Sequence, residues 1–98
     1  MAQKVSDIKA EDIANYIRLD EVSEDDTKTL GNLIAISKSF IEHYTGRNEQ
    51  ELDNYPDFVI VVYILCQDMW DNRTLYVDNS NLNKVVETIL GMHSVNLL

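Results

Sequence analysis

Residues 58–66 read Phe58-Val-Ile-Val-Val-Tyr-Ile-Leu-Cys66, an unbroken apolar stretch whose conformation decides the fold. Its many β-branched residues are compatible with a buried strand. A helix is favoured because Pro56 suits a first helical position and apolar residues continue at helical intervals to Met69 and Trp70. Moreover, no other segment offers an obvious partner strand. We therefore expect a fully buried helix here and an all-α fold.

The longest predicted helix precedes this stretch and has the clearest boundaries. Ser23 is a suitable N-cap, and Asp26 three residues later completes a short capping box. Apolar residues then recur with the 3.6-residue helical period. Gly46 is a natural stop, because glycine readily takes the left-handed conformation that ends many helices. Such a helix would be about 34 Å long at 1.5 Å per residue.

Shorter helices are expected before and after this pair. Residues 10–18 carry apolar side chains at i, i+3 and i+4, behind two acidic residues that suit a first turn. Near the C-terminus, Ser80 is a possible N-cap and Gly91 a possible stop. The prediction is a small four-helix bundle-like domain with a long second helix and a buried third helix, one domain over residues 1–98 with flexible tails at 1–6 and 93–98.

The charge balance limits the possible functions. The 98 residues include 17 acidic residues against 8 lysines and arginines, a net charge of −9. DNA-binding domains and proteins of anionic membrane surfaces need the opposite sign. The single cysteine, Cys66, excludes an intrachain disulfide. Without a signal-peptide pattern or an apolar run near the ~20 residues of a membrane helix, we expect a protein of a reducing cytoplasm.

Motifs for catalysis or cofactor binding are not found in the sequence. The glycines are too isolated for a phosphate-binding loop. Cys66 lies within the apolar stretch, where a thiol behaves as a small hydrophobic group rather than as a nucleophile paired with His43 or His93. The two histidines are too separated to indicate a metal site. We expect no enzyme activity, no cofactor and no metal.

Two groups of residues have a structural and a functional interpretation. An acidic cluster after the first predicted helix lacks the ligand spacing of a calcium loop, so a solvated turn is the simpler interpretation. Trp70 and Arg73 are expected to close the third predicted helix, with a partner contact as the alternative for Arg73. The acidic cluster consists of Asp20, Glu21, Glu24, Asp25 and Asp26.

Three segments carry a family resemblance in their order and spacing. They are residues 10–20, residues 30–46, and residues 56–73 with the ending Met69-Trp-Asp-Asn-Arg73. Together they resemble the small head–tail connector (head-completion, or adaptor) proteins of long-tailed double-stranded-DNA bacteriophages and prophages. The resemblance covers nearly the whole chain. Trp70 stands where the family pattern has a tyrosine, and the C-terminal residues depart from a basic ending.

The resemblance implies a structural protein of the virion, made in the host cytoplasm and located at the head–tail junction. It implies a closed homo-oligomeric ring of about twelve subunits beneath the portal protein. Such a ring extends the DNA channel and offers a surface to the next completion protein or the tail. Duplex DNA passes through without sequence-specific binding.

Charge and apolar character indicate which residues could line such a ring or contact its partners. An anionic lumen repels DNA, so we expect some acids of residues 20–26 to face the lumen or a ring surface. Residues 74–80 connect the third and fourth predicted helices. Apolar residues of this connection and of the C-terminal tail are candidates for portal or subunit contacts, although the tail is equally compatible with a disordered terminus. These candidates are Tyr76, Val77, Val95, Leu97 and Leu98. The alternative function is an acidic helical regulator or inhibitor that binds a basic protein partner.

Overall fold

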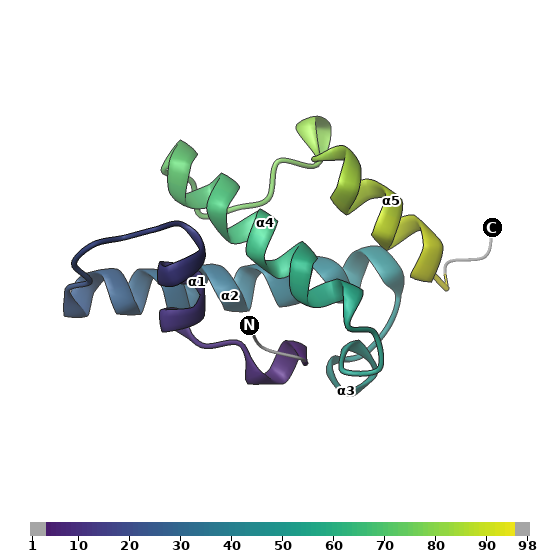
Figure 1. The fold of residues 1–98 in the computed structure, drawn as a ribbon. Coiled ribbons are helices and arrows are strands. Elements are labelled where there is room, and N and C mark those ends of the chain that lie inside the picture. The colour runs from purple at the N-terminus through teal and green to yellow at the C-terminus, as the bar shows by residue number, and fades with distance from the viewer. Residues whose placement is uncertain (1–3, 96–98) are drawn as a thin grey trace.

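The apolar stretch 58–66 lies inside a helix, α4 (Asp57–Asn72), in the computed structural model of the chain, which describes residues 4–95 (Figure 1). Phe58, Val62 and Cys66 are completely buried along this helix, but Ile60 is 45% exposed. The expectation of a fully buried helix is therefore corrected, because one side of α4 is left uncovered by the other helices. Pro56 precedes the first helical residue, where its missing N–H costs no hydrogen bond. Every regular element in residues 4–95 is helical, so the prediction of an all-α fold is confirmed.

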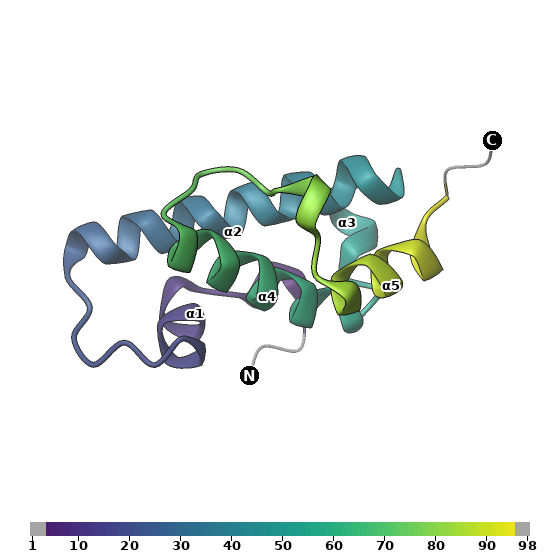
Figure 2. The same ribbon diagram turned by 90° about the horizontal axis from the view of Figure 1, so that it is seen from above.

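The helix α4 crosses the long helix α2 (Glu24–Thr45), and the two run in roughly opposite directions (Figures 1 and 2). Their contact is the most extensive between any two elements. At the crossing, the buried Ser37 hydroxyl donates to the Leu33 carbonyl at 2.8 Å and lies 3.5 Å from the Cys66 sulfur. The hydroxyl is thus satisfied within its own helix, which allows a polar residue in the apolar interface.

Both ends of α2 agree with the prediction. The Ser23 Oγ accepts the Asp26 N–H at 3.1 Å, and the Asp26 carboxylate accepts the Ser23 N–H at 3.2 Å, which completes the capping box. At the other end, Gly46 has φ 76° in the left-handed region. The local sequence therefore determines the length of this helix.

The N-terminal segment is packed, which corrects part of the expected flexible tail at 1–6. Val5, in the short 3₁₀ helix η1 (Val5–Asp7), is 2% exposed. The Ser6 N–H and hydroxyl donate to the two oxygens of the Asp53 carboxylate, at 2.9 and 2.7 Å. Burial of an apolar residue and a two-point hydrogen bond fix residues 5 and 6 on the domain.

The next helix, α1 (Ala10–Tyr16), packs against α2 and α4 and ends two residues earlier than predicted. Arg18 has φ 61°, and the Leu19 N–H donates back to the Ala14 carbonyl at 3.0 Å. This pattern is a Schellman motif, which closes a helix with one left-handed residue. An arginine takes the position that glycine usually occupies, so this helix end could not be predicted from a glycine signal.

A one-turn helix, α3 (Glu49–Leu52), was not predicted. Asn48 caps it: its side-chain oxygen accepts the Glu51 N–H at 2.9 Å, while the Glu51 carboxylate accepts the Asn48 N–H at 3.1 Å. The fully buried Leu52 anchors the turn to the core. The Asn-x-x-Glu pattern was therefore a readable signal for this helix.

The C-terminal helix, α5 (Lys84–His93), differs from its prediction at both ends. Asn83 is the N-cap and accepts the Val85 N–H at 2.8 Å, whereas Ser80 belongs to a separate 3₁₀ helix, η2 (Asn79–Asn81). The helix continues through Gly91 because the packing of its buried residues outweighs the modest helix penalty of one glycine. The expected stop at Gly91 is therefore wrong.

The molecule is elongated, measuring 45 × 27 × 18 Å, and has two distinct ends. At one end lie the end of α2, α3, the start of α4 and the end of α5; at the other lie residues 17–23, the start of α2 and the end of α4 (Figure 1). Residues 73–83, here called the connector, run back along the molecule from α4 to α5 (Figure 2). The candidate contact residues are distributed over these two ends.

Candidate functional site

The acidic cluster lies at the end of the molecule where the chain enters α2 (Figure 1). Asp20, Glu21, Glu24 and Asp25 are exposed, and none forms an ion pair with another residue of the described part of the chain. Asp26 is half-buried and its carboxylate belongs to the α2 capping box. The structure therefore separates one acid with a local role from four that face solvent.

Arg73 ends α4 through its backbone rather than its side chain. It has φ 57°, and the next N–H, from Thr74, donates to the Met69 carbonyl at 3.0 Å, a second Schellman motif. The side chain is exposed and pairs with no carboxylate among residues 4–95. Trp70, one turn earlier, is half-buried.

The connector presents two large apolar side chains to solvent. Leu75 is 67% exposed and Tyr76 is 62% exposed, whereas the next residue, Val77, is half-buried. Leu75 borders a hollow of about 240 Å³ that Trp70, Arg73 and the start of α2 also line. The connector also borders a smaller hollow, of about 80 Å³, lined by Tyr76 and Val77 among others. Sequence reasoning selected Tyr76 and Val77 but not Leu75, the most exposed of the three.

Carboxylates surround this stretch of the connector. Asp68 and Asp78 line the smaller hollow, and Asp26 lines the larger one. Burial raises the pKa of the Asp68 carboxyl, and the neighbouring Asp71 carboxylate raises it further. A hydrogen bond from the Asn81 side chain instead lowers the pKa of Asp78; desolvation opposes this effect, and the backbone N–H groups of Ser80 and Asn81 add to it. Each of the two exposed apolar residues thus borders a hollow that also has a carboxylate in its lining.

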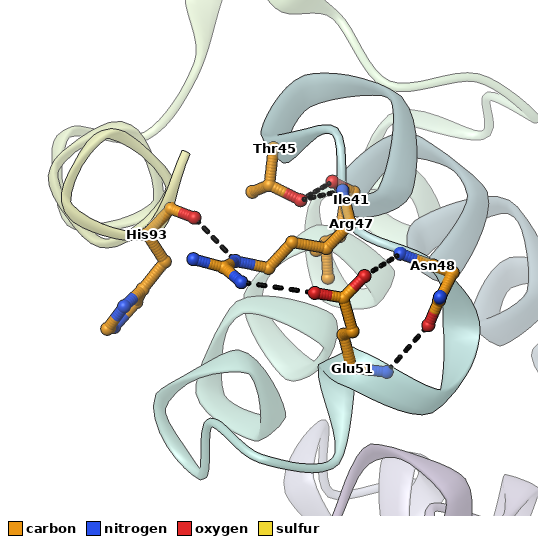
Figure 3. Close-up of polar contacts among 6 residues, drawn as sticks. All are labelled: Ile41, Thr45, Arg47, Asn48, Glu51 and His93. Carbon is orange, nitrogen blue, oxygen red and sulfur yellow. Dashed lines mark hydrogen bonds and ion pairs between the residues drawn. The ribbon is translucent and has the colours of Figure 1, made fainter. Parts of the chain in front are cut away.

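The opposite end of the molecule holds a polar network that sequence reasoning missed, centred on Arg47 (Figure 3). The Arg47 Nε donates to the His93 carbonyl at the end of α5 at 2.7 Å, and an Nη donates to the Glu51 carboxylate at 3.3 Å. The guanidinium also lies over the Tyr55 ring, 4.5 Å from its centroid. One arginine thus joins the end of α5 to α3 and to the segment before α4.

The His93 side chain completes this network, which we call the clasp (Arg47, Glu51, Tyr55, Asp57 and His93). Its Nε2 lies 3.3 Å from the Asp57 carboxylate, and its ring packs against those of Tyr55 and Phe58, with centroids 4.5 and 5.3 Å apart. His93 was expected in a flexible tail, so this expectation is corrected. Long-range contacts, which no local pattern encodes, hold the residue in place.

The residues after α5 return to the end of α2. The Val95 N–H donates to the Thr45 carbonyl at 2.8 Å, and the Thr45 hydroxyl donates to the Ile41 carbonyl at 2.7 Å. Val95 keeps 43% of its surface exposed. The expected tail is therefore fixed as far as Val95, and the other two candidates, Leu97 and Leu98, lie outside the described residues.

Cys66 has the properties of a packing residue. It is fully buried, and burial raises the pKa of its thiol to about 11, a shift that the Ser37 hydrogen bond only partly offsets. At neutral pH it is therefore the protonated thiol, the weakly nucleophilic form. Within residues 4–95, no group of three or more His, Cys, Asp and Glu side chains is arranged to hold a metal ion. No helix in that range combines the length and apolarity needed to cross a membrane.

Comparison with known proteins gives no match. No protein-family model matches the chain. No curated protein is significantly similar in sequence. No solved structure is significantly similar to the fold.

Proposed function

We propose that the protein is a structural subunit of a phage head–tail connector, which assembles into a ring beneath the portal and offers a surface to the next completion protein or the tail. One observation carries the proposal: a domain of 98 residues leaves large apolar side chains exposed on two different elements. They are Leu75 and Tyr76 on the connector, and Val85 and Met92 on α5, each at least half exposed.

Two separate apolar surfaces fit a subunit that contacts more than one protein. A closed ring requires a heterologous contact, in which two different patches of the subunit meet. A further surface is needed for the portal or the next completion protein. Specific protein contacts bury on the order of 800 Å² per partner, so a domain of this size would use much of its surface in such an assembly. The segment resemblance supplies the viral context of the proposal.

The four exposed acids of residues 20–25 support a place along a DNA channel. DNA carries one negative charge per ~1.7 Å of its axis, so an anionic lining repels the duplex and lets it pass without binding. In a ring, these side chains would face the lumen or a ring surface. A ring structure with residues 20–26 wholly buried between subunits would contradict this placement.

The proposal is tested by assembly. We expect sedimentation velocity to show that the protein associates as its concentration rises. If it stays a monomer, we expect electron microscopy to show rings once the portal protein of the same genome is added. Val85→Ser combined with Met92→Ser should weaken assembly, whereas Thr88→Ala on the same helix should not. A chain that neither self-associates nor cosediments with portal rings, but binds a basic protein in a 1:1 complex, would favour the alternative of an acidic inhibitor.

A further inference from the structure

The connector carries two large apolar side chains, Leu75 and Tyr76, that the rest of the described chain (residues 4–95) leaves uncovered. Leu75 and Tyr76 leave more than half of their surface in water, and each borders a hollow that could receive side chains from another molecule. Exposed apolar residues next to hollows and rimmed by polar groups are typical of protein-binding surfaces. The chemistry of the rim indicates what kind of partner fits.

The rim is acidic and its charges are not neutralised. Asp68 and Asp71 are three residues apart on α4, where like charges repel each other. Neither forms an ion pair with any residue in the 4–95 range. The Asp78 carboxylate accepts hydrogen bonds from the Ser80 N–H and the Asn81 side-chain amide, at 3.1 and 2.9 Å. It also forms no ion pair within residues 4–95.

Together these residues form the connector face (Asp68, Asp71, Leu75, Tyr76 and Asp78). Arg73 is the basic residue within this stretch, and its side chain is exposed without a carboxylate partner. Three carboxylates against one guanidinium leave the face acidic. A cationic partner would relieve the repulsion between neighbouring carboxylates, while apolar groups at its centre would cover Leu75 and Tyr76.

A second copy of this chain does not meet these requirements. The chain has a net charge of −9, and the acids of residues 20–26 lie at the same end of the molecule as the start of the connector. Symmetric pairing of two connector faces would bring like charges together, which costs free energy at an interface. A head-to-tail contact would place the face against another surface of a chain with 17 acidic and 8 basic residues, which lacks the excess of positive charge that the face requires. The occupant is therefore a different protein.

We propose that the connector face docks a protein partner whose surface is basic around an apolar centre, and that copies of this chain associate through other surfaces. This inference rests on the proposed function in one respect only: in a head–tail connector, the partner would be the portal or the next completion protein. The face itself is defined by exposed apolar side chains and by unneutralised carboxylates.

The first experiment uses a short amphipathic helical peptide of leucine and lysine as the probe, with an oligolysine of equal charge as its control. Amide shifts of the full-length ¹⁵N-labelled protein locate binding, and Trp70, the single tryptophan, reports by fluorescence from the hollow beside Leu75. We expect the leucine–lysine peptide to shift residues 68–82 most strongly, and oligolysine to bind more weakly. Equal shifts with both peptides, or shifts strongest at residues 20–26, would overturn the inference.

Substitutions separate the apolar and the charged contributions. Leu75→Ser with Tyr76→Ser should weaken peptide binding about tenfold, because the apolar centre of an interface carries most of the affinity. Asp68→Asn with Asp71→Asn should weaken it about threefold at low salt and have little effect at high salt, where exposed charges are screened. Val85→Ser with Met92→Ser is the matched control, because it removes exposed apolar groups from α5 and leaves the connector unchanged.

The second experiment distinguishes this inference from the proposed function. If portal rings bind the wild type and both connector-face variants equally, the inference is wrong and the head–tail role stands. If the peptide maps to the connector face but portal rings do not bind, the inference stands and the head–tail role fails. Loss of self-association in the Leu75→Ser, Tyr76→Ser variant would assign this face to a second copy and overturn the inference.

Discussion

Two carboxylates at opposite ends of the domain illustrate how differently the ends are built. Asp53, beside α3, accepts two hydrogen bonds from Ser6, and these lower the pKa of its carboxyl. Asp68, near the end of α4, has no cationic partner among the described residues, and burial together with Asp71 raises the pKa of its carboxyl. Asp53 is thus satisfied by hydrogen bonds within the chain, whereas no cation within residues 4–95 neutralises Asp68.

The same contrast holds for the polar and apolar contacts. At the clasp end, Arg47 and His93 join α5 to α3 and α4 through hydrogen bonds and ring contacts. At the connector end, Leu75 and Tyr76 stay exposed. Polar groups satisfied within the chain stabilise the fold, while unsatisfied charges and exposed apolar groups are available for binding. The clasp thus gives its end of the molecule a network of internal polar contacts, although exposed apolar residues occur at both ends, since Met92 beside the clasp is 63% exposed.

Among the substitutions that test the contrast between the two ends, removal of the Arg47 side chain should change the free energy of unfolding most. Arg47→Ala removes a charged hydrogen bond and a cation–π contact, so we expect the free energy of unfolding to fall by about 2 kcal/mol. Arg73→Ala at the connector end should change it by less than about 0.5 kcal/mol, since that side chain is exposed and unpaired within residues 4–95. Urea denaturation measures both, and hydrogen exchange should show faster opening of α5 only in Arg47→Ala. Equal losses would contradict the contrast between the ends.

A glycine substitution tests the packing at the clasp end. Gly46 has a positive φ, and a Cβ at this position would lie 2.9 Å from Cγ2 of Val95. We expect Gly46→Ala to destabilise the fold by about 1–2 kcal/mol. Gly31→Ala, in the first half of α2, has open space for its Cβ and should instead stabilise by about 0.5–1 kcal/mol. Thermal unfolding of the two variants should therefore shift in opposite directions.

The end of α4 allows a stabilising substitution beside the connector. The left-handed φ of 57° at Arg73 is sterically unfavourable for a residue with a Cβ atom. Glycine has no Cβ and adopts this φ without that cost. Arg73→Gly should raise the free energy of unfolding by up to about 1 kcal/mol. Arg18→Gly, at the equivalent position after α1, should behave in the same way because Arg18 has φ 61°. A loss of stability in Arg73→Gly would show that its side chain has a structural role.

The smallest expected effect is the change in stability with pH that arises from the Asp53 and Asp68 carboxylates. Because the pKa of Asp53 is lowered from 3.8, its contribution to stability is present above that value and is lost as the pH falls through the folded-state pKa. Asp68, with a raised pKa, has the opposite sign: its ionisation destabilises the fold as the pH rises from 3.8.

At neutral pH, Asp53→Asn should therefore be less stable than the wild type, and Asp68→Asn equally or more stable. Each difference should stay under about 1 kcal/mol, because solvent screens exposed groups, and should shrink at acidic pH. Urea denaturation between pH 3 and pH 7 measures both variants, in a range set by the unfolded value of 3.8. Parallel profiles of the two variants would contradict the opposite roles of these carboxylates.

Much of the fold could be predicted from particular residues. Ser23, Asp26 and Gly46 defined α2 because capping depends on side chains only a few positions apart. The apolar run identified α4 once its spacing beyond residue 66 was considered. The ends of α1 and α5 were harder to predict, because an arginine replaced glycine at the first and packing outweighed a glycine at the second.

The candidate surfaces were only partly predictable. The acidic cluster and Tyr76 were recognised as exposed groups, and the structure has both on the surface. Leu75 was missed because local sequence does not distinguish an apolar residue that packs from one that faces water. The difference depends on whether a distant segment covers it.

The sequence by itself determined the helical class, the long second helix and the acidic character, because periodicity, capping and charge are local properties. Only the tertiary structure decided that Arg47 meets His93, 46 residues away, and that Ser6 meets Asp53, 47 residues away. The same packing left the connector face uncovered. Contacts between distant residues arise when helices find their mutual positions, and this information is spread over the whole chain.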